Sequence, residues 1–361
     1  MTEIKNLYGL ELLRELSLTF GPTGCEDNVA EAIKSVVKPC ADELTLDKMG
    51  NLVAVLYGKN HGTPAEKRLL FSAHMDEVGF MISDICGDGT LKFSLVGGII
   101  PYALGSRRVT VGDETNRVKG TIASKAIHLQ RGDERDKMPS VDGLYIDIGA
   151  KDKEEAEKYV HLGSFGTFDS EFRFFGEGDK LIKGKALDDR FGCTVMCDLI
   201  RRLKNEPQLD HDVYFAFTVR EEVGLSGAKI AAYKVDPDFA VVLESTAVAD
   251  NTGEPDERKV AVLGDGPAVS FMDRSTIYDK NVFEYVLSTA DKNGIKAQPK
   301  RFVSGGNDAG HIHRVRDGVK VAAISAPSRY IHTASNVIHA DDYAATLELV
   351  TAIARDGKFE F

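Results

Sequence analysis

The sequence has little of what a nucleic-acid-binding, membrane-spanning or disulfide-stabilised protein needs. Its 56 Asp and Glu outnumber its 45 Lys and Arg, and the formal net charge of −11 disfavours nucleic acid and anionic membranes as partners. No apolar run approaches the roughly 20 residues of a membrane helix, and no hydrophobic signal-peptide core follows Met1. The five cysteines are odd in number and scattered, so we expect a reduced, cytoplasmic protein.

What remains is an ordinary globular composition, 43% hydrophobic and 28% charged over 361 residues, which suffices for one large domain or two smaller ones. Apolar residues at helical spacing predict a helix from Leu7 to Leu16 and a second one that ends at about Val37. Farther along, strand-like and helix-like segments alternate, which indicates βαβ units and a mostly parallel sheet.

The sequence pattern changes between residues 78 and 176, where short strand-like runs alternate with Gly and Asp turns. Only residues 152–159 have a helical pattern there, and their charges are typical of a solvated helix face. We therefore predict an α/β fold in which a mostly parallel sheet, flanked by helices, carries an inserted small β-rich domain. Residues 1–77 and 177–361 would form the α/β domain, and residues 78–176 the insert.

Histidines and acids follow four of the predicted strands. Because ligands of an α/β sheet bind outside the carboxyl ends of its strands, we expect these side chains to meet at one edge. Four strands that each bring a His or an acid to that edge predict a metal site. The apolar runs are residues 68–73, 213–219, 239–243 and 321–325, and the residues that come after them are His74 and Asp76, Glu221 and Glu222, Glu244, and His332.

The first of these strands runs into His74, with Asp76 two residues further on, so both side chains can point the same way. A ligating histidine usually donates its other N–H to a carboxylate, and Asp76 could be that acceptor. Taken alone, however, such a pair is more often a structural histidine beside a solvated acid.

Asp188 and Asp189 precede a predicted helix from Arg190 to Leu203. An acid at this point can cap the helix by accepting a backbone N–H. One acid is enough for a cap, and a carboxylate here could instead bridge two cations, with one oxygen on each. The segment alone leaves both interpretations open.

Glu221 and Glu222 give the sharpest local signal, because they follow a largely apolar strand and precede a Gly-containing turn at 223–227. Neighbouring carboxylates repel each other unless a cation neutralises them or one is protonated. One of the two would bind metal and the other would act as a general base. The alternative is a pair of solvated surface acids.

Two single residues complete the set. Glu244 follows a buried apolar run, where a lone acid is costly without a partner. His332, taken alone, would more often be a satisfied core histidine. His311 and His313 are a rival pair, but their surroundings predict a helix start, and on a helix they would point to nearly opposite sides. We therefore leave this pair out of the predicted site.

Assembled in order, these segments resemble the M42 family of metallo-aminopeptidases, which includes glutamyl and deblocking aminopeptidases. The resemblance extends nearly end to end, and the order and co-occurrence of the motifs make it specific. Glu244 stands where many relatives have Asp, and Asn307 where Thr is common. The matching segments are Ser72-Ala-His-Met-Asp-Glu-Val-Gly79, Ala123-Ser-Lys-Ala-Ile-His-Leu129, Ile146-Asp-Ile-Gly-Ala150, Lys185-Ala-Leu-Asp-Asp-Arg190, Thr218-Val-Arg-Glu-Glu-Val-Gly-Leu-Ser-Gly-Ala228, Gly305-Gly-Asn-Asp-Ala309 and Ser328-Arg-Tyr-Ile-His-Thr333.

The resemblance implies a zinc-peptidase α/β domain with an inserted β domain, and a site for two divalent metal ions, usually zinc or cobalt. It implies that Glu221 is the general base and that Asp76 orients His74. It also implies a homo-oligomer, commonly a tetrahedral dodecamer with its active sites facing an inner chamber. One ion would be held by His74, Asp188 and Glu244, and the other by Asp188, Glu222 and His332.

We therefore expect a metal-dependent aminopeptidase that removes N-terminal residues from short peptides with a free N-terminus. The free amine would be anchored by acids such as Glu221 or Glu244, and the wall of the substrate pocket would draw on residues 270–275 and 305–310. The alternatives are an amidohydrolase or deacylase of N-acyl amino acids, and a non-catalytic assembly protein that binds through the β insert.

Overall fold

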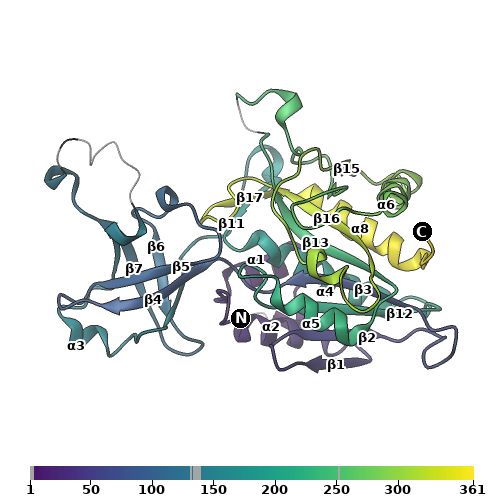
Figure 1. Cartoon of the computed structure of the whole chain (residues 1–361), viewed down its shortest axis with the longest axis horizontal. Helices are drawn as coiled ribbons and strands as arrows, with labels where there is room; N and C mark the ends of the chain where they lie inside the picture. The colour runs from purple at the N-terminus through teal and green to yellow at the C-terminus, as the bar shows by residue number, and fades with distance from the viewer. Residues whose placement is uncertain (1–3, 131, 133–139, 251–252) are drawn as a thin grey trace.

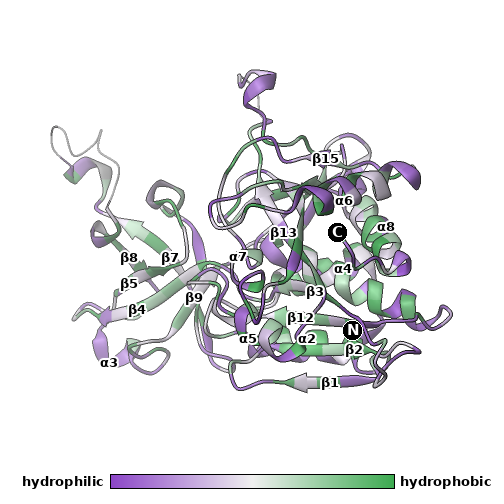
Figure 2. Ribbon diagram, turned by 45° about the vertical axis from the view of Figure 1, so that its right-hand side comes forward, coloured by the Kyte–Doolittle hydropathy of each residue, from purple (hydrophilic) through white to green (hydrophobic). Residues whose placement is uncertain are grey.

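A computed structural model describes residues 4–130, 132, 140–250 and 253–361. It consists of a large α/β body and a smaller β barrel that lies to one side of it (Figure 1). The strands of both parts carry much of the hydrophobic colour in Figure 2, whereas the outer loops are mostly hydrophilic. Among the described residues, no helix is both long enough and apolar enough to cross a membrane.

The α/β body is built on an eight-stranded sheet. Its four central strands, β12, β3, β13 and β16, run parallel to one another, so their carboxyl ends share one edge. In sheet order the strands are β1 (Glu43–Leu46), β2 (Leu52–Leu56), β12 (Asp212–Thr218), β3 (Arg68–His74), β13 (Phe239–Ala247), β16 (Lys320–Ser328), β14 (Ala268–Val269) and β15 (Gln298–Pro299).

Helices cover both faces of this sheet, as predicted. Along β3, Leu69 and Phe71 belong to the apolar cluster on one face and Leu70 to the cluster on the other. This explains why the central strands are continuous apolar runs, since both of their faces are buried. One face carries α1 (Gly9–Leu18), α2 (Asp27–Val37), α4 (Leu187–Lys204), α6 (Lys280–Lys292) and α8 (Ala340–Asp356), and the other carries α5 (Ser226–Val235) and α7 (Ala309–Ile312).

The barrel closes in the strand order β4-β5-β8-β7-β6-β9 around its own apolar core. In this core the ring of Phe80 packs edge-on against the rings of Phe93 and Phe168, with a distance of 5.3 Å between ring centres in each pair. A helix was predicted at residues 152–159, but the helix in the structure, α3, is shorter and covers only Lys153–Ala156. The strands are β4 (Gly79–Ile85), β5 (Leu91–Val96), β6 (Arg108–Gly112), β7 (Arg117–Ser124), β8 (Leu144–Asp147) and β9 (Phe165–Phe168).

A three-stranded sheet joins the two parts. It consists of β10 (Arg173–Phe175), β11 (Leu181–Gly184) and β17 (Asn336–His339). β10 therefore pairs outside the barrel, although the predicted insert of residues 78–176 includes it. That insert also includes residues 131 and 133–139, which lie outside the described residues, and its boundaries stay a prediction.

A buried ion pair fixes the barrel against the α/β body. Lys185 Nζ lies 2.6 Å from Glu77 Oε1, and both side chains are buried. Thr167 of β9 donates its hydroxyl to the other Glu77 oxygen at 2.7 Å. Since Lys185 precedes α4 by two residues, this contact ties the barrel to the segment that carries Asp188.

Candidate metal centre

The four central strands bring the predicted site residues together at one edge of the sheet. His74 is the last residue of β3, and it pairs in register with Thr218, the last residue of β12. Glu244 lies two residues beyond Val242, which pairs with Ser72, so it is level with His74. The expectation that a strand ends at Glu244 is wrong, because β13 continues to Ala247 through its pairing with β16.

Asp188 and Asp189 have different roles: Asp189 caps the helix, and Asp188 faces the histidines of the predicted metal site. Both residues have non-helical backbone angles, and the regular part of α4 begins after them. Asp189 Oδ1 accepts the backbone N–H of Gly192 at 3.0 Å, as a helix cap does. The side chain of Asp188 faces two histidines instead, with Oδ1 3.6 Å from His74 Nε2 and Oδ2 3.1 Å from His332 Nε2.

Both histidines present the same ring nitrogen to these carboxylates. His74 donates from Nδ1 to the backbone carbonyl of Asp76 at 3.0 Å, and His332 donates from Nδ1 to that of Gly98 at 3.0 Å. A carbonyl only accepts, so these bonds fix the tautomer and leave the Nε2 lone pair for a metal. Gly98 lies between β5 and β6, so the barrel side of the molecule orients one of the two imidazoles.

The spacing of the donor atoms suits ligands of a divalent cation. His74 Nε2 lies 3.7 Å from Glu244 Oε2, and His332 Nε2 lies 3.3 Å from Glu222 Oε1. Ligands that bind one zinc at about 2.0–2.2 Å in a tetrahedron are separated by about 3.3–3.6 Å. Glu221 Oε2 is farther away, 4.0 Å from His74 Nε2.

Unpartnered carboxylate oxygens give the second test of fit. Asp188 Oδ1, Glu222 Oε1 and Glu244 Oε1 are buried and accept no hydrogen bond. Within the described part of the chain, no Lys or Arg forms an ion pair with these three acids. Buried carboxylates are costly without a compensating charge. Divalent cations would supply that charge, so the residues present fit a metal site.

The pKa values at this edge reflect the same excess of negative charge. Burial raises the pKa of Glu244 and of Glu221 well above the usual range, and neighbouring acids add to both shifts. Burial also lowers the pKa of His332, but hydrogen bonds and charges from Asp188 and Glu222 outweigh it and raise that pKa to about 11. Where a cation is bound, it takes the place of these protons.

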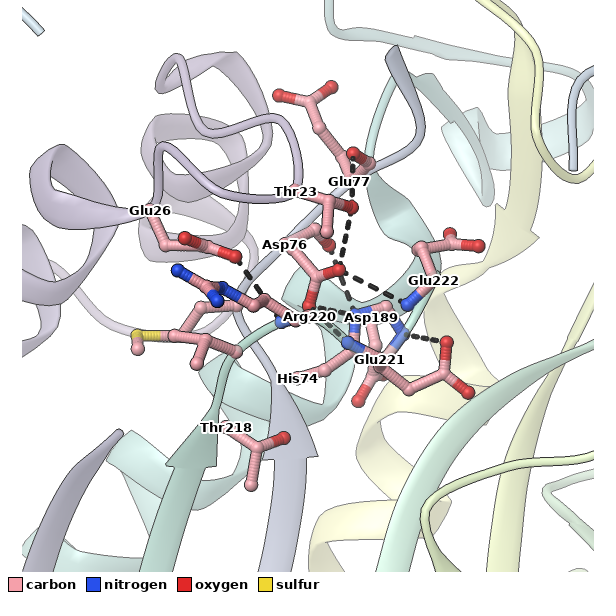
Figure 3. Close-up of polar contacts among 12 residues, drawn as sticks. Thr23, Glu26, His74, Asp76, Glu77, Asp189, Thr218, Arg220, Glu221 and Glu222 are labelled. Carbon is pink, nitrogen blue, oxygen red and sulfur yellow. Dashed lines mark hydrogen bonds and ion pairs between the residues drawn. The ribbon is translucent and has the colours of Figure 1, made fainter. Parts of the chain in front are cut away.

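The Asp76 carboxylate has further partners besides the predicted His74. Its Oδ1 lies 3.5 Å from His74 Nδ1, which instead bonds the backbone carbonyl of Asp76. The carboxylate accepts the backbone N–H groups of Glu221 at 3.0 Å and Glu222 at 3.2 Å, and the Thr23 hydroxyl at 2.8 Å (Figure 3). Asp76 therefore holds the turn on which the two glutamates lie.

Three further acids lie around the site and were not among the predicted site residues. Glu26 accepts the backbone N–H of Arg220 at 3.2 Å, where Arg220 has a left-handed backbone (φ +57°) (Figure 3). Asp308 accepts the Thr218 hydroxyl at 2.8 Å through Oδ2, while its buried Oδ1 has no partner. Asp189 groups closely with His74 and Glu244, in the place where Asp188 was predicted, whereas Asp188 groups closely with His74 and Glu222. Two of these acids could have been noticed in the sequence, because Asp189 directly follows Asp188 and Asp308 directly follows Asn307.

His311 and His313 lie apart from this cluster. A helix does begin here, as the sequence predicts, because α7 starts at Ala309; His311 lies within it and His313 follows its last residue as the C-terminal cap. His311 Nδ1 donates to the backbone carbonyl of Leu225 at 2.9 Å, and His313 Nδ1 to that of Ala309 at 2.7 Å. Both contacts are structural.

Comparison with known proteins identifies the family. Residues 50–349 match the M42 glutamyl aminopeptidase family. This chain belongs to the M42 family. A protein of Acetivibrio thermocellus is 37% identical to it over 90% of this chain and 91% of that protein. The predicted resemblance is thus confirmed, and membership of this M42 family supports aminopeptidase activity.

Solved structures agree with this result. The TET aminopeptidase from the marine sediment archaeon Thaumarchaeota archaeon SCGC AB-539-E09 is 36% identical, with a TM-score of 0.92 over 97% of this chain and 96% of that one. The TET1 peptidase of Pyrococcus horikoshii, which can assemble into a tetrahedron or a large octahedral shell, is 34% identical, with a TM-score of 0.83 over 96% and 98%. The predicted fold is therefore confirmed.

Proposed function

We propose that this M42 protein is a metal-dependent aminopeptidase that hydrolyses N-terminal residues from short peptides. The observation that carries the proposal is that four neighbouring parallel strands and the start of α4 bring two imidazoles and several unpartnered carboxylates to one buried edge. Two divalent cations, zinc or cobalt, would be held there. The proposed ligands are His74, Asp188 and Glu244 for one cation, and Asp188, Glu222 and His332 for the other.

Bound cations would polarise the scissile carbonyl and lower the pKa of the attacking water. Glu221 accepts the proton from that water and then delivers it to the leaving amine. Its carboxylate reaches within 4.0 Å of His74 Nε2 without being the closest acid to it, which suits a base better than a ligand. Asp76 acts as a positioning residue, because its carboxylate fixes the backbone of both glutamates.

The test of exopeptidase activity compares one short peptide with a free and with an acetylated N-terminus. We expect the metal-loaded protein to shorten the free peptide one residue at a time, and mass spectrometry of timed samples would show the ladder. The acetylated peptide should stay intact, because its amine can no longer be anchored by Glu221 or Glu244. Cleavage within the blocked peptide at a comparable rate would contradict the proposal, and removal of the acetyl group would favour a deacylase.

We also propose that the chain assembles into a tetrahedral dodecamer, which the assembly of the related Pyrococcus horikoshii peptidase supports. The expected mass in solution is twelve times that of the 39.4 kDa chain, measured by light scattering after size exclusion. A monodisperse monomer with full activity would show that assembly is not required.

A cytoplasmic location belongs to the same proposal. The five cysteines all lie in the described part of the chain, and each is unpaired. Unpaired cysteines are typical of a reducing compartment.

A further inference from the structure

The two imidazoles of the site are oriented by partners of different origin. His74 donates from Nδ1 to the backbone carbonyl of Asp76, which lies only two residues farther along the chain. His332 donates to the carbonyl of Gly98, which is 234 residues away and belongs to the connection between β5 and β6 of the barrel. The orientation of His74 is therefore set locally, whereas that of His332 depends on where the barrel places one carbonyl.

Packing gives His332 less support than it gives His74. The side chain of His74 is 1% exposed, whereas that of His332 is 28% exposed. His332 also lies in the loop between β16 and β17, where both it and Tyr330 have left-handed backbone angles, with φ of +60° and +56°. Because packing restricts this ring less, the direction of its Nε2 lone pair depends more on the hydrogen bond to Gly98.

The glycine turn that supplies this carbonyl packs against two proposed ligands of the same cation. A Cβ added at Gly98 would lie 3.3 Å from His332 Nδ1 and 3.6 Å from its Cε1. At Gly97, which has a left-handed φ of +83°, an added Cβ would lie 3.4 Å from the Cβ of Glu222. Glycine at both positions thus lets the backbone of the barrel approach the site closely.

The loop that carries His332 is also docked on the barrel. Ala334 belongs to the apolar core of the barrel, and its backbone carbonyl accepts the hydroxyl of Ser170, two residues after β9, at 2.5 Å. Ile99, which directly follows Gly98, is buried in the same core. The barrel therefore holds both partners of the hydrogen bond between Gly98 and His332.

We propose that Gly98 is a positioning residue, through which the barrel sets the affinity of the cation beside His332 but not that of the cation beside His74. The inserted barrel is then a part of the metal centre as well as its neighbour. This inference rests on the proposed function, because it uses the two cation positions named there, and it adds a role for the insert that the ligands themselves do not require.

The test displaces the carbonyl of Gly98 with the substitution Gly98→Ala. The backbone of Gly98 is not left-handed, so alanine can adopt it. Within the described part of the chain, and apart from the neighbours of Gly98 in sequence, the only atoms within 4 Å of the new methyl group belong to the His332 imidazole. Gly105→Ala is the matched control, because Gly105 lies in the same connection, is not left-handed, and has no described atom within 4 Å of an added Cβ.

Calorimetric titration of the metal-free proteins with zinc measures the effect. The wild type should bind two ions per chain, and Gly105→Ala should bind both with the same affinities. We expect Gly98→Ala to weaken one ion by about 10- to 100-fold, the usual cost of losing the hydrogen-bond partner of a ligating histidine, and to leave the other near its wild-type affinity.

Double variants identify the ion that is weakened. In Glu244→Gln, where the remaining ion is expected beside His332, the addition of Gly98→Ala should weaken that ion by the same factor. In His332→Ala, the addition of Gly98→Ala should change nothing further, because the two residues act through one contact. A purely structural effect of Gly98→Ala on the fold would not disappear in the His332→Ala background.

Each outcome decides the proposal. Equal weakening of both ions in Gly98→Ala, or of neither, would overturn it, as would a further loss of affinity in the His332→Ala background. If the wild type binds no zinc, the proposed function fails instead. A crystal structure of metal-free Gly98→Ala then still tests the contact, because an imidazole that keeps its position and its hydrogen bond would contradict the role of Gly98.

Thermal unfolding shows whether Gly98→Ala folds. If it does not, Ser170→Ala takes its place in the titration, because it removes the hydroxyl that holds the Ala334 carbonyl on the barrel. Ser170→Ala should weaken the cation beside His332 and spare the other, and unchanged binding of both ions would then overturn the proposal.

Discussion

Glu221→Gln should lower turnover by about 10²–10⁴-fold, the usual contribution of a positioned general base, while the metal content stays near that of the wild type. The amide keeps the shape of the side chain and removes its capacity to accept a proton. Because Asp76 binds the backbone N–H of Glu221 and not its carboxylate, the substitution leaves the turn in place. Kinetics beside elemental analysis would measure both quantities.

Glu222→Gln is the matched comparison, since the two residues are neighbours held by the same Asp76 carboxylate. The Glu222 carboxylate lies 3.3 Å from His332 Nε2 with its Oε1 otherwise unpartnered, so its loss should weaken a cation ligand. Metal loss should therefore accompany the loss of rate. If Glu221→Gln sheds metal and Glu222→Gln retains it, the two roles are reversed. If Glu221→Gln remains metallated and fully active, Glu221 is not the base.

The fold and the gathering of the site residues could be predicted because both depend on local patterns. Runs such as 68–73 and 239–243 are apolar on both faces, which occurs when helices cover both sides of a parallel sheet. The carboxyl ends of such strands share one edge, so His74 and Glu244 were expected at the same edge of the sheet. That the two residues are neighbours at this edge follows from the pairing of β3 with β13, which the sequence patterns did not predict.

Other features depend on partners that are remote in the chain. Asp76 could be placed beside His74, but its carboxylate bonds the backbone of residues 221 and 222, which are about 145 residues away. The strand with Glu244 extends to Ala247 because β16 pairs with it over that whole length.

Metal removal should abolish hydrolysis, and added zinc or cobalt should restore it, because the proposed cations supply the positive charge that the buried carboxylates lack. Asp188 gives the sharper form of this test. Its Oδ1 faces His74 and its Oδ2 faces His332, so its two oxygens could each reach one of the predicted cations. Asp188→Asn keeps a single, uncharged carbonyl oxygen and should therefore weaken both cation positions.

We expect Asp188→Asn to lose most of both ions and to lower kcat by roughly 10³-fold or more, since metal-ion catalysis contributes several kcal/mol. Glu244→Gln should affect only the cation beside His74, because Glu244 lies 3.7 Å from that imidazole and forms no contact with His332 among the described residues. Elemental analysis should then find close to one ion per chain in Glu244→Gln and close to none in Asp188→Asn. Equal metal loss in the two variants would remove the distinction between a bridging and a terminal ligand. Full activity of a protein shown to be metal-free would end the metal hypothesis, because the carboxylates would then have to be neutralised by protons alone.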